Sequence, residues 1–590
     1  MKLSKNSKKI LNKRYLLRDK NLEIIETPSQ LFRRVAKAVA EVEFKYNKTK
    51  IEVATIKKEF YKMMSNLIFL PNSPTLMNAG TELGQLSACF VLPVGDDIDE
   101  IFNAVHDTAL IHKSGGGTGF SFSRLRPRND IVESTGGHSS GPITFMGVFD
   151  KATEVIIQGG KRRGANMGIL RVDHPDIMDF ITAKMKEKRE CPKCGEQIEG
   201  SNKVLANFNL SVGITDKFME AVEEDGDFNL INPRTGKITQ TVRARTIWSL
   251  LTYMSWTNGE PAIVFLDTMN KANPTPEIGE FEATNPCGET PLLPYESCNL
   301  GSINLSKFFK NRKNGSRIDW VKLKKIVRLA VRFLDNIIDI NKYPLPQIKT
   351  ATLANRKIGL GVMGWADLLL KLEIRYNSLE AVKLGEKIMK FIHDEGFKMS
   401  LELGAERGGF LNQSKSIYKN EQTLRNATVT TIAPTGTIGI IAGCSHGIEP
   451  IFAIVKTRNV KDTLGENLVE INPSIKVSLQ LKGLWSPEME QSLAKSQSKC
   501  VMLPPEMRKV LVTAHDVSPE WHVKMQAAFQ KYVDNAVSKT VNLTFNHSVR
   551  DVEKIYILAH KLGCKGITVY RDGSRKEQLL TIGNGCPTCD

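Results

Sequence analysis

Ala427-Thr428-Val429-Thr430-Thr431-Ile432 leads directly into Ala433-Pro434-Thr435-Gly436-Thr437-Ile438-Gly439. The first segment is a short apolar and β-branched run, typical of a buried strand, and the second is a glycine-bearing turn suited to a helix start. Similar runs occur at 88–92 and 262–266, separated by glycine-rich turns and helical stretches. Buried strands that alternate with helices predict an α/β architecture.

The composition is that of a globular protein. The chain has 590 residues, of which 41% are hydrophobic and 25% charged. No apolar run approaches the roughly 20 residues that cross a bilayer, and the basic N-terminus lacks the apolar stretch of a secretory signal. We therefore expect a cytoplasmic protein without a membrane segment. The formal charge of +17 attracts polyanions, either nucleic acid or phosphorylated small molecules, and does not choose between them.

Three regions follow from the hydrophobic pattern. Apolar residues at helical spacing between 31 and 67 predict a short helical N-terminal region at 1–68. An α/β domain at 69–575 follows, with a polar insertion at about 184–202. Residues 576–590 are expected to form a flexible C-terminal tail.

Ten cysteines need an explanation other than a disulfide framework, which a cytosolic chain of this length does not require. Cys287 has an amide at Asn285 and a carboxylate at Glu289, and an extended loop would place all three side chains on one side. A buried cysteine in a Pro-Gly turn is the plainer alternative. Cys298 follows eleven residues later and Cys89 lies much earlier, a combination that suits thiol redox chemistry.

Two hydroxyl-bearing turns are candidates for binding an anion. The turn at 433–439 can direct backbone N–H groups and two hydroxyls toward one phosphate, and Asn72-Ser73-Pro74-Thr75 offers a similar arrangement. The glycines at 115–119 allow close approach of the backbone to a ligand, but they match neither a P-loop nor a dinucleotide fingerprint.

Together these segments resemble the catalytic subunits of ribonucleotide reductases. Asn285-Pro286-Cys287-Gly288-Glu289, Ser297-Cys298-Asn299-Leu300 and Pro434-Thr435-Gly436-Thr437-Ile438 are each moderately specific, and in this order they are highly specific. The resemblance extends over nearly the whole chain, from about Arg14 to Arg575. It implies a ten-stranded α/β barrel of two antiparallel halves, with a finger loop bearing Cys287 through its centre.

The resemblance also implies the chemistry of the site. Cys287 would form the thiyl radical that takes the 3′ hydrogen, Glu289 would take the 3′-OH proton, and Asn285 would hydrogen-bond the ribose. Cys89 and Cys298 would supply two electrons by closing a disulfide. The implied substrate-binding residues are Ser73, Ala88, Cys89, Gly117, Asn285, Pro286, Cys287, Gly288, Glu289, Pro434, Thr435, Gly436, Thr437 and Ile438.

Two absences favour class II of the family, which uses adenosylcobalamin (coenzyme B12). The sequence has no Tyr-Tyr pair, which class I subunits use to relay a radical from a partner protein, and no Gly-Tyr segment of the class III type. Arg14-Tyr15-Leu16-Leu17 and residues 161–167 look like class II sequences. A class I large subunit that needs a radical-generating partner is the nearer alternative. The cofactor's contacts cannot be named from a motif.

The remaining partners are likewise implied by the resemblance. Asp96 and Arg126 match an allosteric site for a deoxynucleotide effector at the interface of a homodimer, and residues 132–142 and 161–168 resemble its two specificity loops. Cys586 and Cys589 match a tail pair that passes electrons from a thioredoxin or glutaredoxin-like reductant. The substrate is expected to be a ribonucleoside diphosphate, and no nucleic acid is expected to bind.

Cys191 and Cys194 look like one knuckle of a zinc ribbon. Zinc needs four ligands, and the tail pair is the other Cys-x-x-Cys, so zinc binding and the reductant role of the tail compete. A basic zinc-ribbon protein that binds nucleic acid is the distant alternative. It would explain the charge and the cysteine pairs, but neither the segment 285–289 nor the turn 433–439.

Overall fold

The computed structural model describes residues 3–158, 162–185, 188–190, 197–199, 204–311, 317–458, 468–574 and 580–582. The chain begins with helices α1 (Lys5–Arg14), α2 (Pro28–Ala40) and α3 (Lys50–Ser65). Thr27 and Thr49 each close a capping box at the start of the following helix, which satisfies its first N–H groups. The predicted helices between residues 31 and 67 are confirmed.

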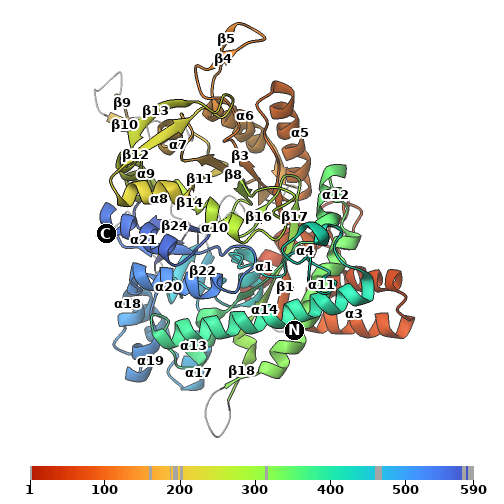
Figure 1. Cartoon of the computed structure of the whole chain (residues 1–590). Helices are drawn as coiled ribbons and strands as arrows, with labels where there is room; N and C mark the ends of the chain where they lie inside the picture. The colour runs from red at the N-terminus through yellow and green to blue at the C-terminus, as the bar shows by residue number, and fades with distance from the viewer. Residues whose placement is uncertain are drawn as a thin grey trace.

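Five parallel strands form the first half of the barrel. They are β2 (Cys89–Val91), β3 (Gly117–Ser121), β8 (Asn166–Arg171), β11 (Phe208–Ile214) and β14 (Ala262–Phe265), paired in that order. Helices α5 (Ile98–Ser114), α6 (Pro142–Val155) and α9 (Ala244–Asn258) lie on their outer side (Figure 1). The strands expected at 88–92 and 262–266 are both present.

The second half runs antiparallel to the first. Its strands are β17 (Ser297–Asn304), β20 (Ile358–Met363), β23 (Thr540–Leu543) and β24 (Gly566–Arg571). The segment expected as a strand at 427–432 fits between β20 and β23 by isolated parallel bridges, Leu360 to Thr430 and Ile432 to Val537. The two halves are joined at both edges, because β2 pairs antiparallel with β17 and β14 pairs antiparallel with β24. The strands therefore form a closed barrel.

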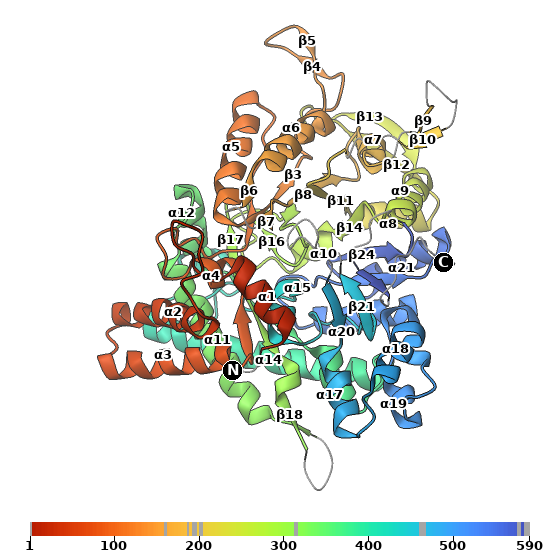
Figure 2. The same cartoon turned by 180° about the vertical axis from the view of Figure 1, so that it is seen from behind.

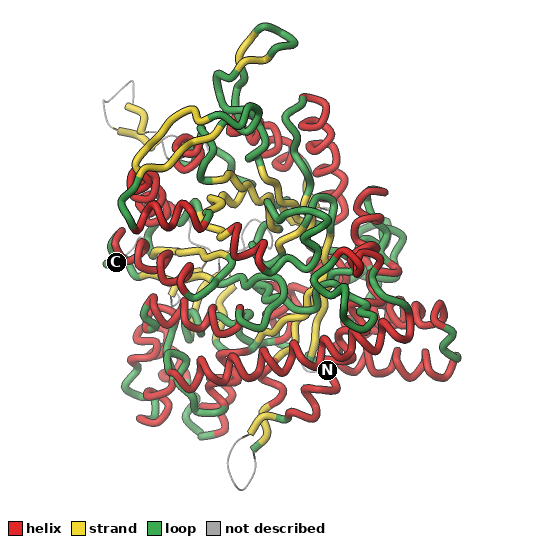
Figure 3. The backbone as a smooth tube through the Cα atoms, in the orientation of Figure 1, coloured by secondary structure: helices red, strands yellow, loops and turns green. Residues whose placement is uncertain are grey.

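The main sheet of the described residues has ten strands, because β1 (Phe69–Pro71) also joins the edge of β17. Figure 3 shows these strands in the interior with helices around them. Helices α11 (Trp320–Ile340), α14 (Leu379–Arg407) and α20 (Pro519–Gln530) cover the second half. The architecture is the expected α/β barrel preceded by helices.

A hairpin of β15 (Ala283–Thr284) and β16 (Pro291–Leu292) enters the barrel and contacts β2, β3 and β8. We call residues 283–292 the finger loop. A close approach makes glycine necessary beside it, because a Cβ on Gly119 would lie 1.7 Å from the carbonyl oxygen of Thr284. The expected finger loop is therefore present.

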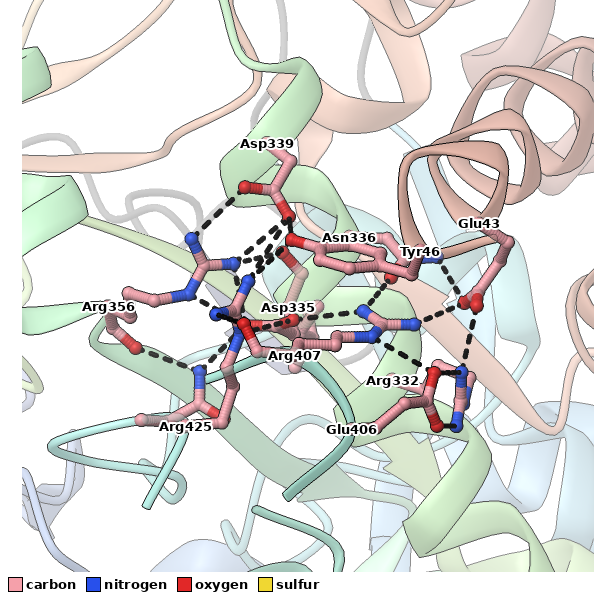
Figure 4. Close-up of polar contacts among 12 residues, drawn as sticks. Glu43, Tyr46, Arg332, Asp335, Asn336, Asp339, Arg356, Glu406, Arg407 and Arg425 are labelled. Carbon is pink, nitrogen blue, oxygen red and sulfur yellow. Dashed lines mark hydrogen bonds and ion pairs between the residues drawn. The ribbon is translucent and has the colours of Figure 1, made fainter. Parts of the chain in front are cut away.

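A buried cluster of charged residues fastens the N-terminal region to the barrel helices (Figure 4). Arg407, whose side chain is fully buried, bridges Glu43 at 2.7 Å and Asp335 at 3.0 Å. Arg356 and Arg425 also pair with Asp335. Burial acts to raise the pKa of Asp335, but the three guanidinium groups lower it to about 2.

No helix within the described ranges combines the length and apolar character needed to cross a membrane. The boundary at residue 69 between the helical region and the barrel stays a prediction.

Candidate active site

Cys287 lies at the tip of the finger loop and is exposed, whereas Asn285 and Glu289 are buried. The expected extended loop is wrong, because the N–H of Gly288 donates to the carbonyl of Asn285 at 3.0 Å and closes a turn. Pro286 at the second position of the turn fits this geometry, as does the positive φ of 78° at Gly288. The turn separates the cysteine from its two polar neighbours.

Both halves of the barrel hold the finger loop in place. From the first half, the Asn209 side-chain amide donates to the carbonyl of Pro286 at 2.7 Å. From the second half, the Ala536 N–H and the Thr431 hydroxyl donate to the carbonyl of Glu289 at 2.9 and 2.8 Å. The position of Cys287 therefore depends on both halves at once.

Cys89 and Cys298 occupy opposite positions in the register of β2 and β17. Both are buried in the apolar cluster inside the barrel, with Met167, Val264 and Leu300. Burial raises the pKa of the Cys89 thiol well above its ordinary value, and the charges of Glu289, Cys298 and Cys287 raise it further. The two thiols are thus close to each other and stay protonated at neutral pH.

Asn285 links the finger loop to Cys89. Its side-chain nitrogen donates to the Cys89 sulfur at 3.1 Å, and its side-chain oxygen accepts from the Thr290 N–H at 3.0 Å. The Thr290 hydroxyl also faces the Cys89 sulfur at 3.8 Å. Two contacts thereby fix the Asn285 amide, and its second N–H remains to serve as a donor. Sequence reasoning missed Thr290, although it lies next to the segment 285–289.

A buried ion pair lies beside Cys298. Lys357 Nζ is 2.6 Å from a Glu296 carboxylate oxygen, and their side chains are 1% and 2% exposed. Burial raises the pKa of Cys298, the Lys357 cation lowers it, and Glu296 raises it again. No sequence pattern connects Lys357 with a cysteine 59 residues earlier, so this neighbour could not be predicted.

A cavity of about 960 Å³ opens in front of the finger loop. Of the predicted site residues, Pro286, Cys287, Gly288 and Pro434 line it. Residues from both halves of the barrel form its walls, including Met167 and Ser211 from the first and Ser538 and Thr568 from the second. The cavity is therefore the space through which a ligand reaches Cys287.

Other predicted substrate residues do not line this cavity. The backbone carbonyl of Ala88 accepts a hydrogen bond from the Gly117 N–H at 3.0 Å. Gly117 also lies close to the finger loop, because a Cβ at this position would be 2.9 Å from the Pro286 ring. The backbone of Thr435 has the left-handed helical conformation, with a φ of 54°. Its side-chain hydroxyl accepts a hydrogen bond from the Gly447 N–H at 2.7 Å. Gly436, Thr437 and Ile438 begin helix α15 (Gly436–Ala442), and Ser73 begins helix α4 (Ser73–Asn78).

Asp96 and Arg126 form an ion pair of 2.8 Å. The Arg126 guanidinium also donates to the carbonyl of Ile131, at the base of the hairpin formed by β4 (Ile131–Val132) and β5 (Gly137–His138). This hairpin projects from the barrel in Figure 1. The pair is thus joined to the first of the expected specificity loops.

The predicted metal and tail cysteines, Cys191, Cys194, Cys586 and Cys589, lie outside the described residues. Within the described ranges, no group of three or more His, Cys, Asp and Glu side chains is arranged to hold a metal ion.

Comparisons with known proteins show the family of the chain. Residues 1–84 match the family model "Ribonucleotide reductase, all-alpha domain", and residues 87–423 and 419–570 match "Ribonucleotide reductase, barrel domain". A protein of Thermoplasma acidophilum named vitamin B12-dependent ribonucleoside-diphosphate reductase is 49% identical, over 99% of this chain and 81% of its own length. A protein of the same name from Mycobacterium tuberculosis is 45% identical, over 98% of this chain and 81% of its own length.

A solved structure has the same fold. The α subunit of Actinobacillus ureae class Id ribonucleotide reductase superposes with a TM-score of 0.76 over 97% of both chains, at 24% identity. Because the family models cover nearly the whole chain and the relatives match over most of their length, the chain belongs to the ribonucleotide reductase family.

Proposed function

We propose that the chain is the catalytic subunit of an adenosylcobalamin-dependent ribonucleotide reductase. It converts ribonucleoside diphosphates to 2′-deoxyribonucleoside diphosphates. The observation that carries the proposal is Cys287 on the finger loop, at the cavity and beside the cross-strand pair Cys89 and Cys298. The names of the relatives from Thermoplasma acidophilum and Mycobacterium tuberculosis support the cobalamin and the diphosphate.

The cavity beside Cys287 is large for a small-molecule site and is the proposed place for the ligands. Its volume of about 960 Å³ is at the upper end of the range of roughly 300–1,000 Å³ for small-molecule sites. Beside Cys287 there is open space, because a Cβ on Gly288 would meet no heavy atom within 4 Å. Gly443, His446 and Phe452 also line the cavity and would hold the cofactor. When bound, adenosylcobalamin supplies the initiating radical by cobalt–carbon homolysis.

The chain's own residues carry the reduction. The Cys287 thiyl takes the hydrogen from C3′, and the Glu289 carboxylate takes the 3′-OH proton. The 2′-hydroxyl leaves as water, and the Cys89 and Cys298 thiols give up two electrons and two protons as they form a disulfide. The hydrogen then returns from Cys287 to C3′. One ribonucleotide and two thiols thus give one deoxyribonucleotide, one disulfide and one water.

Asn285 orients the ribose with its remaining amide N–H. The nucleotide contacts are Ser73, Ala88, Gly117 and residues 434–438, with the phosphates at the two hydroxyl-bearing turns.

A deoxynucleotide effector binds near Asp96 and Arg126 in a homodimer. Cys586 and Cys589 transfer electrons from a thioredoxin or glutaredoxin-like protein. Zinc is no part of this proposal.

The decisive experiment uses the purified chain alone. Adenosylcobalamin, a dithiol and a ribonucleoside diphosphate should give the deoxyribonucleotide, measured by chromatography. Formation of product only after addition of a second, radical-generating protein would refute the cobalamin proposal and favour class I. The same reaction without adenosylcobalamin is the control.

A further inference from the structure

Helix α4 carries Ser73, one of the proposed nucleotide contacts, at its first position. Six residues are too few for a helix that is stable by itself. Asn72 caps it by accepting from the Thr75 N–H at 2.9 Å. The orientation of Ser73 must therefore come from the elements that pack around α4.

Tyr15 contacts the start of α4. Its hydroxyl is 2.7 Å from the Ser73 hydroxyl, and the residue is only 2% exposed. Leu11 and Leu16, on either side of it in the chain, are buried in the large core of the second half. The Tyr15 ring is thus held firmly, and one hydrogen bond restricts rotation of the Ser73 side chain.

Arg34 contacts the end of the same helix. Its guanidinium donates to the carbonyls of Ala79 and Leu76 at 2.5 and 3.3 Å, where helix carbonyls lack partners of their own. Glu26 fixes Arg34 at 2.8 Å and also accepts from the Leu17 N–H at 3.1 Å. The N-terminal region therefore holds α4 at both ends.

The same region reaches the second hydroxyl-bearing turn. The Ser7 hydroxyl donates to the carbonyl of Ile440 in α15 at 2.9 Å, and α1 packs against α15 (Figure 2). Residues Ser4, Lys5 and Asn6 line the cavity that contains Cys287. One continuous segment thus contacts Ser73 in the first proposed phosphate turn and the helix that begins at the second.

We propose that the N-terminal segment, Ser4 to Leu17, is part of the nucleotide-binding site, with Tyr15 as the positioning residue for Ser73. The inference rests on the proposed function, because Ser73 must contact the substrate. It gives a role to the Arg14-Tyr15-Leu16-Leu17 motif. Tyr15 acts on binding and touches no reacting atom, so its loss should affect nucleotide affinity and not the chemical step.

The test is a double-mutant cycle of Tyr15→Phe and Ser73→Ala. The dissociation constant of a ribonucleoside diphosphate is measured by equilibrium binding, and KM and kcat are measured by turnover. Each single variant should weaken binding and raise KM about three- to tenfold, the range expected for one hydrogen bond. We expect kcat to change less than about twofold and the double variant to bind no more weakly than Ser73→Ala alone.

Tyr61→Phe is the matched control, because the Tyr61 hydroxyl makes a similar 2.9 Å contact with Ser29 between α3 and α2. It should leave nucleotide affinity unchanged. Equal weakening in Tyr61→Phe and Tyr15→Phe would overturn the inference, as would unchanged affinity in Tyr15→Phe while Ser73→Ala binds weakly. Unchanged affinity in Ser73→Ala would instead refute Ser73 as a substrate contact, which is a failure of the proposed function.

Discussion

Cys89 and Cys298 face each other across the strand pair that joins the two halves of the barrel. Opposite residues in an antiparallel pair have Cβ atoms roughly 4.5–5.5 Å apart, and disulfides need about 3.5–4.5 Å. A small movement of β2 against β17 is therefore sufficient to form the bond. Their burial protects the pair from oxidants in solution.

We expect enzyme that has reacted once without a reductant to contain a disulfide between Cys89 and Cys298, identified by peptide mass spectrometry. Cys89→Ser and Cys298→Ser should each abolish multiple turnovers with a dithiol, because neither variant can close the bond. A disulfide between other cysteines would disprove this pairing.

Cys287→Ser should abolish deoxyribonucleotide formation, with nucleotide affinity nearly unchanged, because an O–H bond is much harder to break homolytically than an S–H bond. Cys564→Ala, which changes a buried thiol in another core cluster, is the control and should remain active. Turnover of Cys287→Ser above a few per cent of the parent would contradict the radical role.

Burial raises the pKa of the Cys298 thiol, and the Lys357 charge offsets part of that rise. Lys357 should therefore make Cys298 a better leaving group, when the disulfide is reduced, than it would be without this cation. In Lys357→Met we expect reduction of the Cys89–Cys298 disulfide by a small dithiol to slow several-fold. Lys357→Met with Glu296→Gln should restore much of the rate, since it removes both charges. Equal rates in the parent and Lys357→Met would show that the ion pair only stabilises the fold.

Changing both Cys586 and Cys589 to serine should strongly reduce turnover coupled to thioredoxin and spare turnover with a small dithiol. Ile582, four residues before Cys586, pairs with Lys456 at the cavity, and four extended residues span about 14 Å. Equal activity with thioredoxin in parent and variant would exclude an electron-transfer role for the tail, and metal analysis of both would then test zinc.

Asp335→Asn should destabilise the protein at neutral pH by about 3–5 kcal/mol, because it removes the buried partner of three arginines. The pKa of Asp335 is lowered to about 2 from an ordinary 3.8. Its contribution is therefore fully present above pH 3.8 and lost as the pH falls toward 2. The difference in unfolding free energy between parent and variant, measured with denaturant, should narrow by about 2 kcal/mol over that interval, and a constant difference would contradict the shift.

The apolar runs predicted the strands at 88–92 and 262–266, because buried strands leave uninterrupted apolar runs. The barrel and its finger loop were predicted only through the resemblance to the ribonucleotide reductase family. The prediction that residues 285–289 form an extended loop was wrong. There Pro286 and Gly288 favour a turn, and local turn preferences are stronger than the alternation of side chains in an extended chain. Lys357 and Tyr15 were not predictable as neighbours of Cys298 and Ser73, since those contacts depend on tertiary packing alone.

Closure of the ring has a consequence for synthesis of the protein. Ile263 of β14 pairs with Ile567 of β24. The pairing of these two strands, which closes the barrel, therefore cannot form until a strand about 300 residues later in the chain has been made. Contacts of such sequence separation form slowly, and a chain emerges from the ribosome at about 5–20 residues per second. For at least roughly 15 s, Cys89 and Cys298 stand in an open half-barrel. The two cysteines are therefore more accessible to oxidants while the protein is being made than they are in the finished barrel.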